Sequence, residues 1–199
     1  MGATATRQEI VAAADRLFYE RGFEATSFAD IASVVGLSRG NFYYHFKTKD
    51  EILQAVIARR LSMTGEMLDA WQTEGDPADR IRSFIGILIM NREKIVAHGC
   101  PVGTLCTELA KLDHLARGEA VRLFTLFRDW LAGQFAALGR EADADALAMH
   151  ILMRSQGVAV LATAFGDESF IRREVDDMCA WLEAQRPERP APSQTAAVN

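Results

Sequence analysis

Residues 38–49 concentrate side chains that bind phosphate. The segment carries three basic residues, Arg39, Lys47 and Lys49, and no acidic one. Its polar aromatic residues are Tyr43, Tyr44 and His45. Lysine and arginine neutralise phosphate charge, while tyrosine hydroxyls donate hydrogen bonds to phosphate oxygens. A helix that begins after Ser38 would add its free backbone N–H groups to the same surface. The segment therefore predicts contact with the backbone of a nucleic acid.

The first residues after Ser38 also have the chemistry to contact base edges. Arg39 carries a planar guanidinium whose donors match O6 and N7 of guanine, and the Asn41 amide matches the edge of adenine. Gly40 lies between them and allows close approach of the backbone to the duplex. We expect sequence-specific contacts from this short stretch and phosphate contacts around it.

Three helix starts within residues 26–53 must position these side chains. A serine or threonine able to act as an N-cap precedes each of them: Ser27, Ser38 and Thr48. Asp30 and Glu51 follow the first and last of these at capping-box spacing. Gly36 ends the first short helix. Two short helices joined at Gly36 and preceded by a longer amphipathic helix predict a helix-turn-helix, whose second helix enters the DNA major groove.

The residues around these caps resemble the N-terminal domain of tetracycline-repressor-type (TetR family) regulators. The resemblance covers about residues 6–55 and rests on these positions: Ile10, Ala13, Leu17, Phe18, Gly22, Phe23, Thr26, Ser27, Ile31, Ala32, Gly36, Leu37, Ser38, Gly40, Tyr43, His45, Phe46, Lys49 and Leu53. It implies a homodimeric, all-helical transcription factor, usually a repressor, that binds palindromic operator DNA and responds to a small-molecule effector.

The resemblance also implies roles for single residues. By their positions in the family pattern, Thr26 and Ser27 would contact phosphate at the start of the second helix. His45 would contact phosphate at the end of the third helix. For His45 the alternative is packing against Phe46, which we expect in the core together with Phe42. The full expected DNA-contacting set is Thr26, Ser27, Ser38, Arg39, Gly40, Asn41, Tyr43, Tyr44, His45 and Lys49.

The composition favours an all-α globular protein. The chain has 199 residues, of which 49% are hydrophobic and 25% charged, close to globular averages. Only Pro77 and Pro101 interrupt the first 186 residues, and no alternating pattern predicts a strand. We expect a helix-turn-helix head (residues 1–55), a connecting helix (about 49–72), a regulatory and dimerisation body (76–185) and a disordered tail (186–199).

The net charge of −5 is unevenly distributed along the chain. Residues 1–60 contain 8 basic and 7 acidic side chains, whereas the remainder contains 14 and 20. The acidity therefore belongs to the body and does not argue against DNA binding by the head. The longest uncharged apolar stretch, residues 157–166, is shorter than a membrane span. With three cysteines in no disulfide-framework pattern, the sequence predicts a soluble cytoplasmic protein with no membrane partner.

Effector-binding residues in the body can be proposed only by residue type. Pockets combine apolar residues with a few polar groups, which is also the composition of a core. The candidates are Phe84, Leu88, Cys100, Leu105, Cys106, Leu109, Phe124, Phe127, Leu152 and Gln156.

The last two expected helices are candidates for a dimer interface. The segment 144–165 is apolar on nearly all sides and needs cover on all sides. We expect it to pair with the segment 168–185 and with the symmetry mates of both, as in the TetR family. The candidate residues are Leu152, Gly157, Val160, Ala164, Ile171, Val175, Met178, Trp181 and Leu182.

Cys100 raises two alternatives. It precedes Pro101 at an expected helix start, where the helix dipole favours a reactive thiolate, so a redox-sensing or electrophile-sensing repressor is one alternative. The other interpretation of Cys100 itself is a small buried hydrophobic residue. The alternative from another class is a helical enzyme using a thiol and histidines, but the sequence offers no nucleophile–base pair. We expect no catalytic residues, no cofactor and no metal site, since His98, Cys100, Cys106 and His114 fit no zinc spacing.

Overall fold

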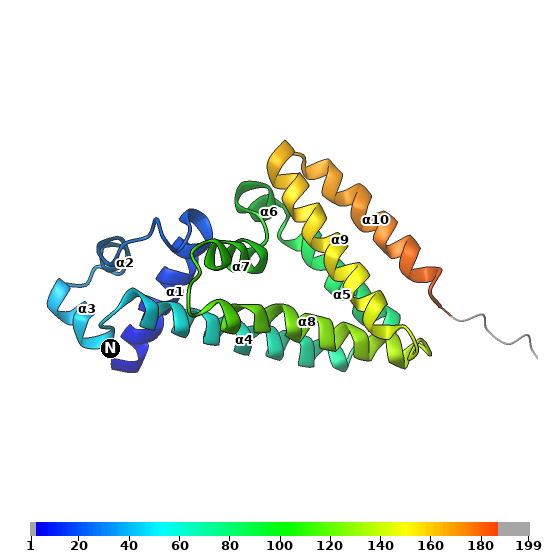
Figure 1. Cartoon of the computed structure of the whole chain (residues 1–199), viewed down its shortest axis with the longest axis horizontal. Helices are drawn as coiled ribbons and strands as arrows, with labels where there is room; N and C mark the ends of the chain where they lie inside the picture. Colours follow the sequence, from blue (N-terminus) through cyan, green and yellow to red (C-terminus); the bar gives the residue numbers. More distant parts are fainter. Residues whose placement is uncertain (1–2, 187–199) are drawn as a thin grey trace, which may run out of the picture.

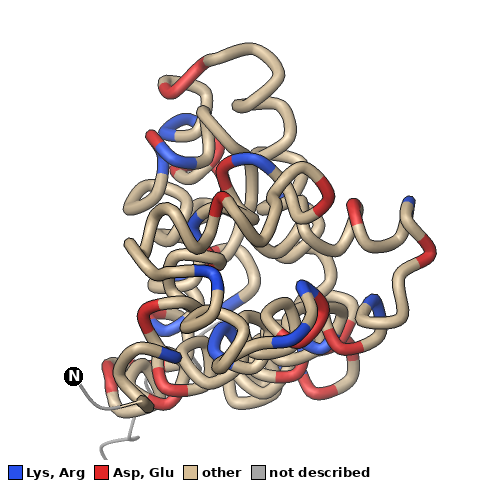
Figure 2. The backbone as a smooth tube through the Cα atoms, turned by 90° about the vertical axis from the view of Figure 1, so that its left-hand side faces the viewer, with Lys and Arg blue, Asp and Glu red and all other residues tan. Residues whose placement is uncertain are grey.

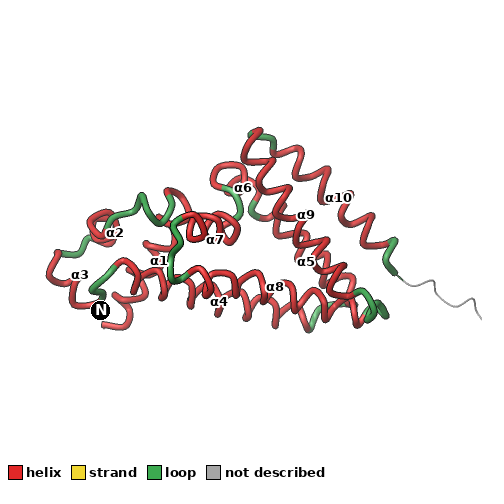
Figure 3. The backbone as a smooth tube through the Cα atoms, viewed as in Figure 1, coloured by secondary structure: helices red, strands yellow, loops and turns green. Residues whose placement is uncertain are grey.

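The computed structural model describes residues 3–186, with the helices arranged as in Figure 1. Within this range the chain forms ten α-helices and no strand (Figure 3), which confirms the all-α prediction. The helices are α1 (Ala3–Arg21), α2 (Phe28–Val35), α3 (Arg39–His45), α4 (Lys49–Gln72), α5 (Pro77–Met90), α6 (Arg92–His98), α7 (Pro101–Lys111), α8 (Arg117–Ala137), α9 (Ala144–Phe165) and α10 (Glu168–Glu183). The tail expected at 186–199 lies, apart from Arg186, outside the described residues.

The head consists of α1, α2 and α3, at one end of the elongated molecule (Figure 1). Ser27 caps α2, and the Asp30 carboxylate accepts a hydrogen bond from the Ser27 N–H at 2.8 Å, which completes the predicted capping box. Gly36 ends α2 with a φ of 71°, a conformation that glycine adopts without strain. Thr48 caps α4 by accepting the Glu51 N–H at 3.1 Å. With Ser38, which caps α3, the three predicted helix starts are present.

The long helix α4 connects the head to the body and lies beside α8 (Figure 1). At its far end Trp71 packs on Trp130 with ring centroids 5.8 Å apart. The Gln134 amide, which is buried, donates to the Gln72 side-chain oxygen at 2.8 Å. These contacts attach the C-terminal end of α4 to the body.

The body core is formed by α5, α8, α9 and α10. Asp76 caps α5 in a capping box with Asp79, and Pro77 occupies the first turn. Helix α9 is long and apolar enough to span a membrane by those two criteria alone. Nine of its residues are nevertheless buried against other helices, which is the environment of a core helix in a globular protein.

A second core joins the head to part of the body. Leu105 and Leu109 of α7 and Ala120 of α8 are buried in one cluster with head residues such as Ile10 and Phe18. The expected division between the connecting helix (about 49–72) and the body (76–185) does separate α4 from α5, but the packing crosses it. The head is therefore completed by helices that follow it by more than fifty residues.

Candidate DNA interface

Helix α3 presents its first turn to solvent. Ser38 caps the helix by accepting the Asn41 N–H at 3.4 Å. Arg39, Gly40 and Asn41 are all exposed. Phe42, on the opposite face, is 1% exposed and packs in the head core. A buried aromatic anchor behind an exposed first turn is the arrangement that a recognition helix needs.

An aromatic stack supports the Arg39 side chain. Its guanidinium carbon lies 5.7 Å from the centroid of the Tyr43 ring, within cation–π range. Tyr43 in turn stacks on Phe28 of α2, with centroids 5.3 Å apart and an interplanar angle of 27°. The same residues line a groove of about 420 Å³ between α2 and α3. The stack thus supports the Arg39 side chain from Tyr43, one turn further along α3.

The residues after the first turn form a polar rim. Tyr44 is 71% exposed, and its ring contacts the half-buried His45 edge to face at 5.1 Å. Lys47 donates a hydrogen bond to the Tyr43 carbonyl. Phe46 is buried. Within the described residues, the ring of His45 pairs with Tyr44 and not with Phe46. Both tyrosines are exposed to solvent.

Basic and acidic positions are interspersed on the side of the molecule seen from the head (Figure 2). The positive charge of residues 38–49 is therefore local, as its count of three basic residues implies. A small basic patch on an acidic protein limits non-specific attraction to DNA.

Thr26 does not lie where the family resemblance places it. Its side chain is fully buried, and its hydroxyl donates to the carbonyls of Gly22 at 2.7 Å and Leu17 at 3.4 Å. A buried hydroxyl already bonded to backbone has no access to phosphate in this conformation. Thr26 instead fixes the loop between α1 and α2. Ser27 stays exposed, and its hydroxyl donates to the Asp30 carboxylate at 2.5 Å, which lowers the pKa of Asp30.

Lys49 is also committed to contacts within the protein. Its ammonium group donates to the carbonyls of Phe23 at 3.0 Å and Glu24 at 3.3 Å. It also lies 4.3 Å from the centroid of the Phe23 ring. In this conformation Lys49 joins the start of α4 to the α1–α2 loop, and a phosphate contact would compete with these bonds.

The chain is similar to known transcriptional regulators over most of its length. Residues 10–56 match the family described as "Bacterial regulatory proteins, tetR family". An uncharacterized helix-turn-helix transcriptional regulator of Lactococcus lactis subsp. lactis is 27% identical over 86% of this chain and 90% of its own length. The repressor DhaR of Mycobacterium sp. (strain GP1) is 28% identical over 62% of each chain. The chain belongs to the TetR family. It is a DNA-binding transcriptional regulator with a helix-turn-helix head.

The fold of this TetR-family protein is shared with solved structures. A TetR transcriptional regulator from Legionella pneumophila superposes with a TM-score of 0.79, at 24% identity, over 94% of this chain and all of that one. At this identity the likeness shows the fold. These relatives favour neither the thiol-sensing repressor nor the thiol and histidine enzyme.

The residues expected to bind an effector fall into two separate clusters. Phe84, Leu88 and Leu152 are buried in the body core, and the half-buried Cys100, Phe124 and Phe127 pack against it. Leu105, Cys106 and Leu109 belong instead to the core shared with the head. Gln156 lies on α9, opposite Gly103 of α7. The ten residues therefore do not line one cavity, because one face of α7 is used for packing on the head.

The expected dimer residues also divide by exposure. Leu152, Ile171, Met178 and Leu182 are buried within one chain, and the half-buried Val175 and Trp181 pack against the same core. Gly157, Val160 and Ala164 are exposed on α9. Four exposed apolar residues that the sequence did not single out lie with them on α9: Met149, Met153, Leu161 and Phe165. Their spacing is helical, but in a helix that is apolar nearly all round, sequence alone does not tell which stripe faces outward.

The cysteines of α7 are placed as a cap and a packing residue. Cys100 caps α7, and its sulfur accepts the Gly103 N–H at 3.5 Å. Burial raises the pKa of the Cys106 thiol to about 11, so this residue is a poor nucleophile at neutral pH. Among residues 3–186, no three His, Cys, Asp or Glu side chains are grouped as metal ligands.

Proposed function

We propose that the protein is a cytoplasmic homodimeric repressor that binds palindromic operator DNA and is released from it by a small-molecule effector. The observation that supports this most directly is the exposed first turn of α3. Arg39, Gly40 and Asn41 lie there in front of a buried Phe42. In this proposal these three residues contact base edges, while Ser27, Ser38, Tyr43, Tyr44 and His45 contact phosphates.

Two protomers would associate through α9. Val160 is 64% exposed and Phe165 is 77% exposed, and Gly157 and Ala164 on the same helix allow close approach of a partner helix. An apolar stripe of this length on a monomer is unusual and marks an association surface. A two-fold axis through such a surface would direct two α3 helices to half-sites one or more DNA turns apart.

An effector would act on the body core. Phe84 and Phe127 form an edge-to-face pair there, with centroids 5.4 Å apart. Trp130 Nε1 and His150 Nε2 are buried side-chain nitrogens without a hydrogen-bond partner among the described residues. Polar groups of this kind favour a ligand that supplies the missing hydrogen-bond partners. By linkage, an effector that weakens DNA binding is itself bound less tightly by the DNA complex.

The test is selection of bound duplexes from a randomised DNA library. We expect the wild-type protein to enrich a palindromic sequence and to bind it less tightly as salt rises. Arg128→Ala, an exposed substitution in the body, serves as the control and should enrich the same sequence. Enrichment of no sequence by a folded wild-type protein would contradict the proposal.

A further inference from the structure

A carboxylate from the body binds the backbone of the head between α1 and α2. Glu108 of α7 accepts the Phe23 N–H and the Glu24 N–H, each at 2.9 Å. Gly22, at a φ of 91°, makes this approach possible, because a Cβ there would lie 3.0 Å from Glu108 Oε1. The contact spans more than eighty residues of sequence.

The carbonyl groups of the same two loop residues are bound from α4. Lys49 donates to the carbonyls of Phe23 and Glu24 at 3.0 and 3.3 Å. Both peptide N–H groups and both carbonyls of Phe23 and Glu24 are thus held by two side chains of opposite charge. Neither of these side chains belongs to the three helices of the head. The Phe23–Glu24 part of the loop is therefore also held from outside the head.

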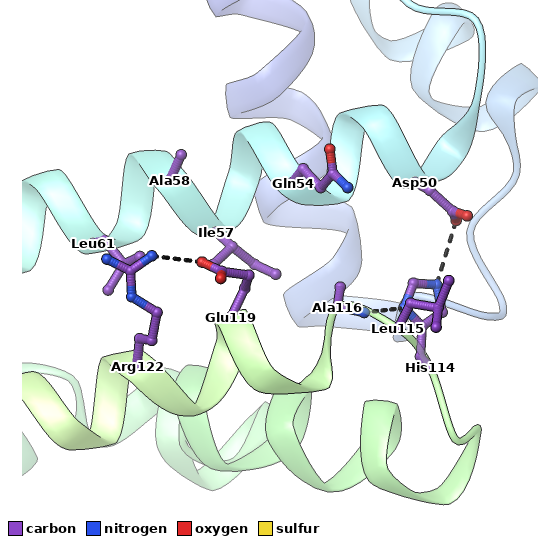
Figure 4. A pocket seen from close by; sticks show the side chains of 10 residues that line it. All are labelled: Asp50, Gln54, Ile57, Ala58, Leu61, His114, Leu115, Ala116, Glu119 and Arg122. Carbon is purple, nitrogen blue, oxygen red and sulfur yellow. Dashed lines mark hydrogen bonds and ion pairs between the residues drawn. The ribbon is translucent and has the colours of Figure 1, made fainter.

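The turn between α7 and α8 adds a third contact to the loop. The His114 ring meets the Phe23 ring edge to face, with centroids 5.1 Å apart. His114 Nδ1 accepts the Ala116 N–H at 3.0 Å, so Nε2 carries the proton and faces Asp50 Oδ1 at 3.4 Å. This pair lies at one end of a groove of about 390 Å³ between α4 and α8 (Figure 4).

The opposite end of α7 is bonded to α4, which is paired there with α1, and it lies against a side chain of α9. Arg60, whose side chain is only 10% exposed, donates to the Pro101 carbonyl at 2.7 Å and pairs with Asp15 at 2.7 Å. A Cβ at Gly103 would overlap the side-chain oxygen of Gln156 on α9. Helix α7 therefore extends from the helix with the exposed apolar stripe to the α1–α2 loop.

The loop sets where the helix-turn-helix begins. Thr26 bonds back to Gly22 and Leu17, and Ser27, the next residue, caps α2. Movement of the Phe23–Glu24 backbone would move the start of α2, and α3 follows through the aromatic contacts between Phe28, Phe42 and Tyr43. The orientation of α3 thus depends on where α7 holds the loop.

We propose that Glu108 is a positioning residue for DNA recognition, through which α7 sets the orientation of the helix-turn-helix relative to the body. Displacement of α7 would then change the separation of the two α3 helices in a dimer. The part of this inference that concerns DNA rests on the proposed function, whereas the contact itself is a property of the free protein.

The first test is hydrogen exchange of single amides in the free protein. Glu108→Ala removes both carboxylate oxygens that accept the Phe23 and Glu24 N–H groups. Glu108→Gln keeps the shape of the side chain but replaces one accepting oxygen with an N–H₂ group, which faces one of these two N–H donors. Glu119→Gln, an exposed carboxylate on α8 paired with Arg122, is the matched control. We expect exchange at Phe23 and Glu24 to accelerate at least about tenfold in the Ala variant, less in the Gln variant, and not in the control, with α9 amides unchanged.

Two results would overturn the inference at this stage. One is unchanged exchange at Phe23 and Glu24 in both Glu108 variants. The other is equal acceleration of all amides, which would indicate loss of global stability only. If Glu108→Ala does not fold, the exchange of the Phe23 and Glu24 amides in Glu108→Gln tests the inference instead, and the same two results would overturn it.

The second test uses operator duplexes in which base pairs are added or removed between the half-sites. We expect the wild type to prefer one spacing, and Glu108→Ala to lower the preference for that spacing over its neighbours severalfold while the salt dependence stays the same. An identical spacing preference in both proteins would contradict the positioning role. If the wild type selects no operator at all, the proposed function fails, and the exchange result still decides whether Glu108 holds the loop.

Discussion

The head and the body differ in how their functional side chains are specified. In the head, each short helix has its own cap, and the exposed residues of α3 follow Ser38 directly. In the body, the same apolar residue types form the core, the surface stripe of α9 and the packing on the head. Local chemistry therefore identifies the DNA interface, whereas the roles of body residues depend on which helix each face meets.

The apolar stripe of α9 gives the largest expected effect. Val160→Asp places a charge at the centre of the proposed dimer contact, and burying an unpaired carboxylate costs several kcal/mol. We expect the dimer dissociation constant to rise by about a thousandfold, measured by sedimentation equilibrium. Thr125→Asp, an exposed polar site on α8, should leave association unchanged. A wild-type protein that sediments as a monomer at micromolar concentration would contradict the dimer.

The shared core gives the next effect. Leu109 is fully buried among head residues although it belongs to α7. Leu109→Ala should lower the free energy of unfolding by about 3 kcal/mol, because a buried leucine leaves a cavity. Denaturant unfolding of the head and body should remain one transition. Separate transitions in the wild type would show that the head and body are independent, against the packing described above.

The body cysteines provide a pH test of burial. Because the pKa of Cys106 is raised to about 11, its thiolate fraction at pH 8 is about a hundredfold below that of an ordinary thiol. Iodoacetamide should modify Cys106 correspondingly slowly, and the rate should rise about tenfold per pH unit up to that pKa. Mass spectrometry of the labelled peptides measures this. Fast modification of Cys106 at pH 8 would mean that α7 leaves the shared core.

The caps and the helix-turn-helix were predictable because each depends on a few neighbouring residues. Ser27 with Asp30, and Asp76 with Asp79, have side chains that bond within their own first turn. The contact of Glu108 with Phe23 and Glu24 was not predictable, because nothing local distinguishes Glu108 from an exposed helical glutamate. The family resemblance placed Thr26 against phosphate, which the structure contradicts, because the inward orientation of this side chain depends on the carbonyls of Leu17 and Gly22 at the end of α1.

In the body, the roles of single residues could be predicted only in part, because they depend on contacts between distant helices. Leu105 and Leu109 have the spacing of a helix face, and this pattern predicts burial without naming the partner. For α9, periodicity was nearly absent, so the buried Leu152 and the exposed Val160 could not be distinguished. Those assignments required the packing of α8, α5 and α10 around α9.

The most direct test of the account compares base preference in two head variants. Arg39→Ala removes a proposed base contact, and Tyr44→Phe removes the hydroxyl of a proposed phosphate contact. In a quantitative binding series over all single-base operator variants, we expect Arg39→Ala to lose about 1–3 kcal/mol of discrimination at one position in each half-site. Tyr44→Phe should weaken every sequence by a similar severalfold factor and leave the preferences unchanged. Uniform weakening by Arg39→Ala, with altered base preference in Tyr44→Phe, would contradict the assignment of the first turn of α3 to base recognition.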